Sequence, residues 1–247
     1  MLIRRRGRRR RPGEAAQKLL EELARDFGTS APKLRVVGSP AERLEACGDA
    51  EVAGCYRFKE GVVVLSEEML ESVETLLHEY AHHLQLALHD GDWRTAFADT
   101  WSPHCRRRHE AEAKAFASWL TPFYKRRFEK ILEGSEGGAD RERLCGHIAA
   151  IVEREVGRRA PKLLEEAKRG AWHAVGELYR LADNVGFMLS AARRACGLDA
   201  SSAVAVDLGL GRVAGLAEKD AYAEAEEELE WVKGELSRIL GRMRARF

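Results

Sequence analysis

The sequence lacks a net charge of either sign. Its 41 lysine and arginine residues are balanced by 40 aspartate and glutamate residues, so the formal net charge at pH 7 is only +1. A charge this small creates no overall field that would select a nucleic acid or another charged partner. Any attraction of that kind has to come from a local cluster of charge.

Cysteines are also few, and long hydrophobic runs are absent. The five cysteines are scattered and odd in number, which argues against the disulfide framework of a secreted protein, although Cys47 and Cys55 could meet across a hairpin. No stretch approaches the length of a transmembrane helix. The arginines at the start are followed by an amphipathic segment, unlike a signal peptide. We therefore expect a cytoplasmic protein with no membrane partner.

Positive charge is concentrated at the N-terminus, where seven arginines lie between Arg4 and Arg11. Residues 1–12 are expected to form a basic, disordered tail. The tail is either a solvated extension or a weak contact to the phosphates of a nucleic acid. It has no aromatic residue on which a base could stack.

The chain of 247 residues, 45% hydrophobic and 33% charged, is long enough for one large or two small domains. The glycine-rich residues 134–138 are the clearest linker. We predict an α+β domain over residues 13–133 and an all-helical domain over residues 139–247. Strands are expected at 33–37, 53–58 and 62–65. Helices are expected at 14–27, 40–47, 66–89, 93–101, 105–123, 140–168 (with Pro161 bending or dividing it), 171–196 and 218–247, with a less regular apolar piece at 199–215.

The most informative stretch is the helix expected over residues 66–89, which contains the letters H-E-Y-A-H at residues 78–82. Apolar residues recur in it at spacings of three and four, and Ser66 is suited to cap its start. On such a helix, residues four apart lie about 40° apart around the axis and roughly 6 Å apart along it. His78 and His82 can therefore both reach one metal ion.

Glu79 lies about 100° around this helix from His78. It is close enough to a metal-bound water to take its proton, but badly placed to be a ligand. The H-E-x-x-H pattern on a helix is typical of zinc hydrolases, in which the glutamate is the general base. We therefore expect Zn²⁺ as the cofactor, His78 and His82 as metal ligands and Glu79 as the catalytic base.

A zinc hydrolase also needs a third protein ligand and an open fourth position. His89 would lie roughly 16 Å from His78 if the helix continues to Leu88. A glutamate on the next helix, Glu110 or Glu112, would instead give the gluzincin arrangement, in which two helices cross at the metal. Three polar side chains near this segment are weaker candidates for a ligand or a transition-state donor: His104, Cys105 and His109. A second donor to the oxyanion, beside zinc, could be Tyr124, His147, His173 or Tyr179.

Two segments carry a family resemblance. Residues 110–122 read E-A-E-A-K-A-F-A-S-W-L-T-P, and residues 78–84 read H-E-Y-A-H-H-L. They resemble the E-x-E-A-x-x-F-A-x-x-L-x-P and H-E-h-x-H-x-L segments of ImmA/IrrE-type metallopeptidases, over about half of the chain. The resemblance implies a zinc-dependent peptidase that hydrolyses a protein or peptide substrate, with His78, His82 and Glu110 as ligands and Glu79 as the base; Glu112 stays an alternative to Glu110.

The hairpin before the helix agrees with this interpretation. In the zincin layout, the second strand leads into the H-E-x-x-H helix and offers an exposed edge to an extended substrate. We therefore expect a zincin-like domain in which a small sheet packs on the H-E-x-x-H helix and on a glutamate-bearing helix. The second domain is expected to recognise the substrate, cover the site or form a homodimer through its helices.

Two other functions fit parts of the sequence. One is a non-enzymatic regulatory or interaction protein that retains a metal site. The other is a SprT-like nucleic-acid-associated protease recruited by the arginine tail, because His89-Asp90-Gly91-Asp92-Trp93 resembles the His-x-x-x-aromatic piece of that class. An intact Glu79 favours a peptidase, since a structural metal site has no use for a base.

Overall fold

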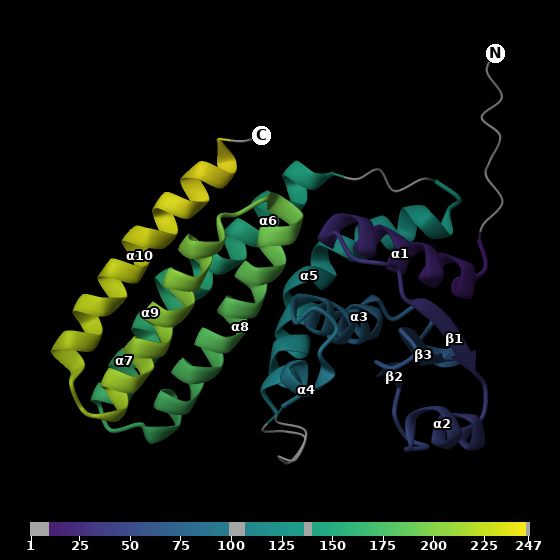
Figure 1. Ribbon diagram of the computed structural model, residues 1–247, viewed down its shortest axis with the longest axis horizontal. Helices are drawn as coiled ribbons and strands as arrows, with labels where there is room; N and C mark the ends of the chain where they lie inside the picture. Colours follow the sequence, from purple (N-terminus) through teal and green to yellow (C-terminus); the bar gives the residue numbers. More distant parts are fainter. Residues whose placement is uncertain (1–9, 99–106, 136–139, 246–247) are drawn as a thin grey trace. The chain divides into compact units, whose positions relative to one another are not determined.

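The computed structural model describes residues 10–98, 107–135 and 140–245, and the fold of these residues is α+β (Figure 1). Contacts divide the chain into two compact units. An N-terminal unit comprises residues 1–103 and 113–139, and a C-terminal unit comprises residues 104–112 and 140–247. The domain boundaries predicted from the sequence stay a prediction. The basic stretch of the tail (residues 1–9) and most of the linker (residues 136–138) lie outside the described residues.

The N-terminal unit contains a three-stranded sheet in the order β1-β3-β2. The strands are β1 (Lys33–Val37), β2 (Gly54–Arg57) and β3 (Val62–Ser66). β3 pairs in parallel with β1 and antiparallel with β2, with Gly54 opposite Leu65. The run Val-Val-Val-Leu makes β3 a buried central strand, as β-branched residues favour. The expectation that this strand offers a free edge to a substrate was therefore wrong, because both of its edges are paired.

Helices α1 (Pro12–Phe27) and α3 (Val73–Leu88), and α5 (Arg108–Leu132) from residue 113 onward, form the apolar core of this unit together with the sheet. The apolar face of α1 is fully buried, as its 3.6-residue spacing predicts. Phe27 at its end contacts the rings of Tyr80 on α3 and Phe116 on α5, with centroids 6.1 Å and 5.4 Å away. This aromatic cluster holds α3 and α5 against each other.

A buried group of charges also joins α1 to α5. The Arg127 guanidinium pairs with Asp26, and with Glu22 at 3.0 Å, and the Tyr124 hydroxyl donates to Asp26 at 2.8 Å. Burial raises the pKa of the Glu22 carboxyl, while the positive charge of Arg127 opposes the rise. Removing one partner of such a group leaves an uncompensated buried charge, so the pairs fix how α5 packs on α1.

Two helix boundaries in this unit differ from the sequence-based expectation. Ser66 ends β3, a short 3₁₀ turn follows at Glu67–Met69, and α3 begins only after Ser72, whose hydroxyl accepts a hydrogen bond from the Thr75 amide. Ser66 and Ser72 are both residues that commonly cap a helix. Because Ser66 is paired in β3, the helix begins after Ser72. Helix α5 continues through Pro122 to Leu132. Pro122 has no amide hydrogen to donate within the helix, but it lies on the exposed side, where water can bond the carbonyl that is left without a partner.

The remaining helices of the N-terminal unit are short. Helix α2 (Pro40–Cys47) follows Ser39, which forms a capping box with Glu42. Helix α4 (Trp93–Ala96) is one turn long, whereas a helix over residues 93–101 was expected; residues 99–101 lie outside the described part of the chain.

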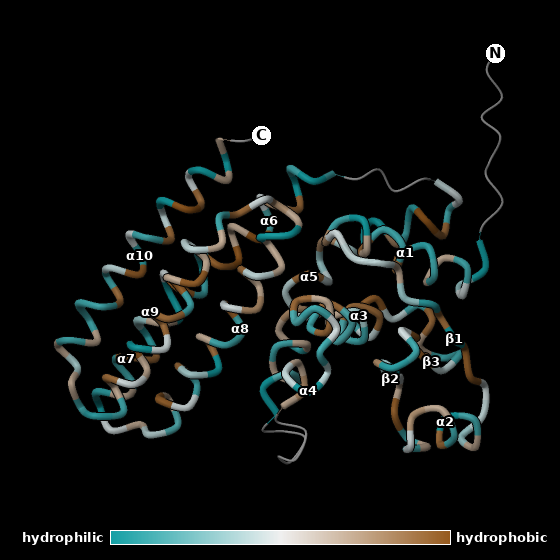
Figure 2. The backbone as a smooth tube through the Cα atoms, in the orientation of Figure 1, coloured by the Kyte–Doolittle hydropathy of each residue, from teal (hydrophilic) through white to brown (hydrophobic). Residues whose placement is uncertain are grey.

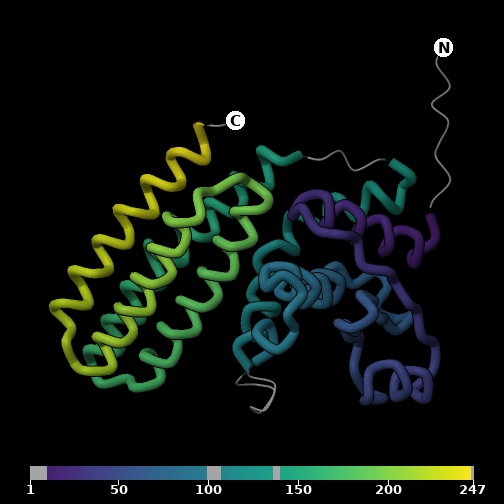
Figure 3. Tube along the Cα trace, viewed as in Figure 1, coloured from purple at the N-terminus to yellow at the C-terminus, as the bar shows by residue number. Residues whose placement is uncertain are grey.

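The C-terminal unit is helical throughout its described residues. It contains α6 (Arg141–Arg154), α7 (Ala160–Lys168), α8 (Trp172–Cys196), α9 (Ala200–Glu218) and α10 (Tyr222–Arg244). Figure 3 shows α8, α9 and α10 running up and down beside one another, and Figure 2 shows hydrophobic residues recurring regularly among hydrophilic ones along α10. A π-helical turn (Glu155–Arg159) separates α6 from α7 just before Pro161, which agrees with the predicted division.

Helix α9 corrects two expectations. The sequence suggested a less regular apolar piece at 199–215, yet the structure has a continuous helix whose Gly209 packs against α10. In length and composition α9 could also cross a membrane, although no such stretch was expected. About 44% of that stretch is buried within the protein, and core helices of soluble proteins can have the same length and composition. The absence of a membrane partner stays a prediction.

Two disulfides also differ from expectation. Cys47 at the end of α2 is bonded to Cys55 on β2, and Cys145 on α6 is bonded to Cys196 at the end of α8. The sequence had left a Cys47–Cys55 pair open, whereas the second pair, 51 residues apart in sequence, was not anticipated. Cys105 lies outside the described residues. The cytoplasmic location stays a prediction.

Candidate metal centre

Three of the predicted site residues lie together. His78 and His82 on α3 and Glu110 in the first turn of α5 each offer one ligand atom, and these atoms lie within 4.8 Å of one another. The Nε2 atoms of His78 and His82 are 3.3 Å apart, with the two rings perpendicular. The helical spacing brings the histidines together, and the packing of Phe116 on Tyr80 brings α5 to them.

The donor set fits a zinc ion. With Zn–N distances of about 2.0–2.1 Å and a tetrahedral angle, two imidazole nitrogens lie about 3.3 Å apart, close to the observed separation. Two imidazoles and one carboxylate are a ligand set found in catalytic zinc sites, which keep a fourth position open. These three residues therefore suit a zinc ion, although the same donors also bind other divalent transition metals.

Burial is uneven around these ligands. The side chains of His82 and Glu110 are buried, whereas His78 is partly exposed. Glu79 is also buried, at 5% exposure, and lies beside β2: a Cβ atom added to Gly54 would be 3.5 Å from the Glu79 Cγ atom. The strand beside Glu79 is therefore the edge strand β2, which the sequence did not reveal.

The neighbouring histidine, His83, is not part of the group of three and forms hydrogen bonds with other residues. Its Nε2 donates to the Ser30 carbonyl at 2.8 Å, so its Nδ1 accepts from the Tyr56 hydroxyl at 2.9 Å. Burial lowers the pKa of His83, although the bond to Ser30 opposes the shift. Burial also raises the pKa of Tyr56 to about 12. His83 is thus a neutral residue that ties α3 to β2 and to the loop after α1.

The alternatives for the third ligand lie elsewhere. Glu112 is buried on the same helix, but its carboxylate accepts from the Arg108 guanidinium at 2.7 Å. His89 is the exposed residue that ends α3. Among the described residues, the group of three close ligand atoms contains Glu110 and neither of these two.

The other polar side chains predicted as weaker candidates have these surroundings. His109 is buried, with its Nε2 atom 3.6 Å from a Glu110 oxygen. Tyr124 is committed to Asp26 in the core, and the Tyr179 hydroxyl donates to Glu218. His104 and Cys105 lie outside the described residues.

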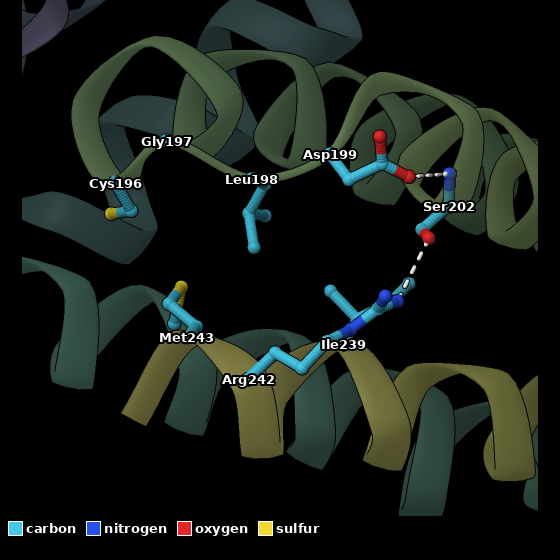
Figure 4. A pocket seen from close by; sticks show the side chains of 8 residues that line it. All are labelled: Cys196, Gly197, Leu198, Asp199, Ser202, Ile239, Arg242 and Met243. Atoms are coloured by element: carbon cyan, nitrogen blue, oxygen red, sulfur yellow. Dashed lines mark hydrogen bonds between the residues drawn. The ribbon is translucent and has the colours of Figure 1, made fainter. Parts of the chain in front are cut away.

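The C-terminal unit has a small pocket of about 50 Å³ between the start of α9 and the end of α10 (Figure 4). Figure 4 shows Asp199 accepting from the Ser202 amide at the start of α9, and Arg242 of α10 donating to the Ser202 hydroxyl. Donation from Ser201 and from Ser202 lowers the pKa of Asp199 to about 2. The polar groups of this pocket bond one another, which is the pattern of a helix cap and not of a ligand site.

Comparison with known proteins adds no family. No protein-family model, no curated protein and no solved structure matches the chain significantly. The residues that point to a function are therefore His78, Glu79, His82 and Glu110.

Proposed function

We propose that the protein is a zinc-dependent metallopeptidase that hydrolyses peptide bonds of a protein or peptide substrate. The observation that carries the proposal is the group formed by His78, His82 and Glu110, with the buried Glu79 next to the first histidine. Residues 13–133 would then form a zincin-like domain of the gluzincin kind. The resemblance of residues 78–84 and 110–122 to ImmA/IrrE-type enzymes supports the same assignment.

In this proposal His78, His82 and Glu110 hold the metal. Bound zinc would polarise the peptide carbonyl and make water acidic enough to attack at neutral pH. Glu79 accepts the proton of the attacking water and passes it to the leaving amine. The half-buried strand β2 passes beside the Glu79 side chain at Gly54, and Glu79 itself is buried. A buried carboxylate is suited to accepting one proton and returning it.

The test replaces Glu79 by Gln in the full chain. Wild-type protein is expected to contain about one zinc ion per chain, measured by mass spectrometry, because the group offers one set of three ligands. New peptide termini in a mixture of denatured proteins report cleavage. Glu79→Gln should retain the metal and lose cleavage by about 10²–10⁴-fold, because only the general base is removed.

Glu74→Gln is the matched control, since Glu74 is an exposed acid in the first turn of the same helix. It should retain both zinc and activity. Full cleavage by Glu79→Gln would contradict the mechanism. Stoichiometric zinc with no cleavage by the wild type would instead favour a non-enzymatic protein that retains the metal site.

A further inference from the structure

Gln85 is a buried polar residue one turn after His82 on α3. Its side chain is 2% exposed, and its Oε1 atom lies 2.9 Å from Nδ1 of His82. Residues three apart on a helix face the same side, which explains the contact. The sequence reasoning did not consider Gln85, although the spacing was visible.

This contact bears on which nitrogen of His82 carries the proton. The Nε2 atom of His82 points toward Nε2 of His78, and a metal on that side requires Nε2 to be unprotonated. The proton of the neutral ring then resides on Nδ1, where it can be donated to an acceptor. The Gln85 amide oxygen is an acceptor only, so it favours this tautomer.

We infer that Gln85 is a positioning residue, which fixes the tautomer and ring orientation of His82 for metal binding. The inference rests on the proposed metal site. Hydrogen-bonded partners of metal-binding histidines hold the ring in place and raise its basicity. The Phe97 ring, with its centroid 6.1 Å from that of His82, contacts the imidazole as a second restraint.

The first measurement needs no variant. Long-range proton–nitrogen NMR spectra of the metal-free full chain, recorded well above the pH at which histidines titrate, report the tautomer of each ring. We expect the Nδ1–H form of His82. A dominant Nε2–H form in the wild type would overturn the inference, even if zinc binds.

The second measurement compares zinc affinity, by chelator competition, among variants of the full chain. Gln85→Leu should bind zinc about 10–100-fold more weakly, because the partner of His82 is lost. Gln85→Glu keeps an acceptor at that place and should bind within a few-fold of the wild type. Unchanged affinity in Gln85→Leu would overturn the inference.

Gln17→Leu is the matched control. The Gln17 side chain accepts from the Leu34 amide at 2.8 Å and donates to the Pro32 carbonyl at 3.3 Å, so it ties α1 to β1 and contacts no proposed ligand. This variant should lose stability but keep zinc affinity. If the wild type binds no zinc, the proposed function fails, whereas the NMR spectrum still decides the tautomer of His82.

Discussion

Glu110 and Glu112 are two residues apart on α5, and both are buried, but their carboxylates have different surroundings. Glu110 lies with His78 and His82, whereas Glu112 pairs with Arg108 one turn earlier. The sequence could not separate them by rule, because each begins the same E-x-x-A pattern. The difference arises from which side of α5 faces α3, and that depends on tertiary packing.

This difference predicts opposite outcomes for two conservative substitutions. Glu110→Gln removes an anionic oxygen ligand and should lower the zinc content of the purified protein well below one ion per chain. Glu112→Gln should keep the zinc and lose the ion pair with Arg108. Zinc loss in Glu112→Gln alone would contradict the assignment, and loss only in His89→Ala would favour the SprT-like alternative.

Among single residues, the sequence predicted those whose relative positions are fixed by the spacing within one helix. His78, Glu79 and His82 follow from one motif, because their relative positions depend on a single helix. Gln85 was equally close in sequence but is recognised only once its buried contact with His82 is known. Gly54 could not be found at all, since its approach to Glu79 depends on how β2 packs on α3.

Among the elements, α9 shows how closely two helices of the C-terminal unit approach each other. A Cβ atom on Gly209 would lie 2.5 Å from a methyl group of Val232 on α10, whereas nothing lies within 4 Å of one on Gly211. The glycines of this segment are thus tolerated in a helix, and one of them allows close packing.

Alanine substitutions at these two positions should therefore differ in sign. Gly209→Ala should lower the free energy of unfolding by about 1–3 kcal/mol through overpacking against α10. Gly211→Ala should raise it by about 0.5–1 kcal/mol, because alanine favours the helix and reduces the freedom of the unfolded chain. Chemical denaturation measures both, and equal effects would contradict the close approach of α9 and α10.

The start of α9 predicts a pH effect. Because Asp199 has a lowered pKa in the folded chain, the unfolded chain binds its proton first as the pH falls. The stabilising contribution is present above pH 3.8, the ordinary value, and is lost as the pH falls toward 2. Asp199→Asn should make the acid dependence of the unfolding free energy shallower by up to about one proton between these values.

Ser201→Ala removes the hydroxyl that contributes most to the lowered pKa of Asp199. This variant should give an intermediate slope, because the Ser202 amide still donates to Asp199. An Asp199→Asn variant with the wild-type slope would show that the cap does not contribute to acid stability.

The spacing of hydrophobic residues predicted that most of the helices and strands exist, but it did not predict where each of them begins and ends. The apolar face of α1 and the strand at Lys33–Val37 were predicted closely, because each has a clear pattern and a nearby turn. The start of α3 was predicted seven residues too early, because serine often caps a helix but Ser66 belongs to β3. Pairing in a sheet overrides a local capping preference, and a single sequence does not show that pairing.

For the whole molecule, each unit has its own covalent link. The Cys47–Cys55 bond closes a short loop in the N-terminal unit, and the Cys145–Cys196 bond closes a long one in the C-terminal unit. In the chain-entropy model, the longer loop contributes more to stability, about 4 kcal/mol against about 2.5 kcal/mol for the shorter loop.

Paired serine variants test this order. Cys145→Ser with Cys196→Ser should reduce the free energy of unfolding more than Cys47→Ser with Cys55→Ser. Cys105→Ser is the control, because Cys105 belongs to neither bond. Thiol titration of the denatured, unreduced chain should find one free thiol, the five cysteines less the four in disulfides. Five free thiols would show that the bonds do not form in the purified protein.

The absence of a side chain at Gly54 has a consequence for relatives of this chain. A Cβ atom there would lie 2.6 Å from Leu65 and 2.7 Å from the Val64 carbonyl oxygen, so any larger residue would move the strand beside Glu79. Gly54 lies 24 positions before His78, Gln85 lies 7 after it and Glu110 lies 32 after it. Sequences that share this site should keep all three residues near these separations, which turns a five-residue motif into a search pattern that few chance matches would satisfy.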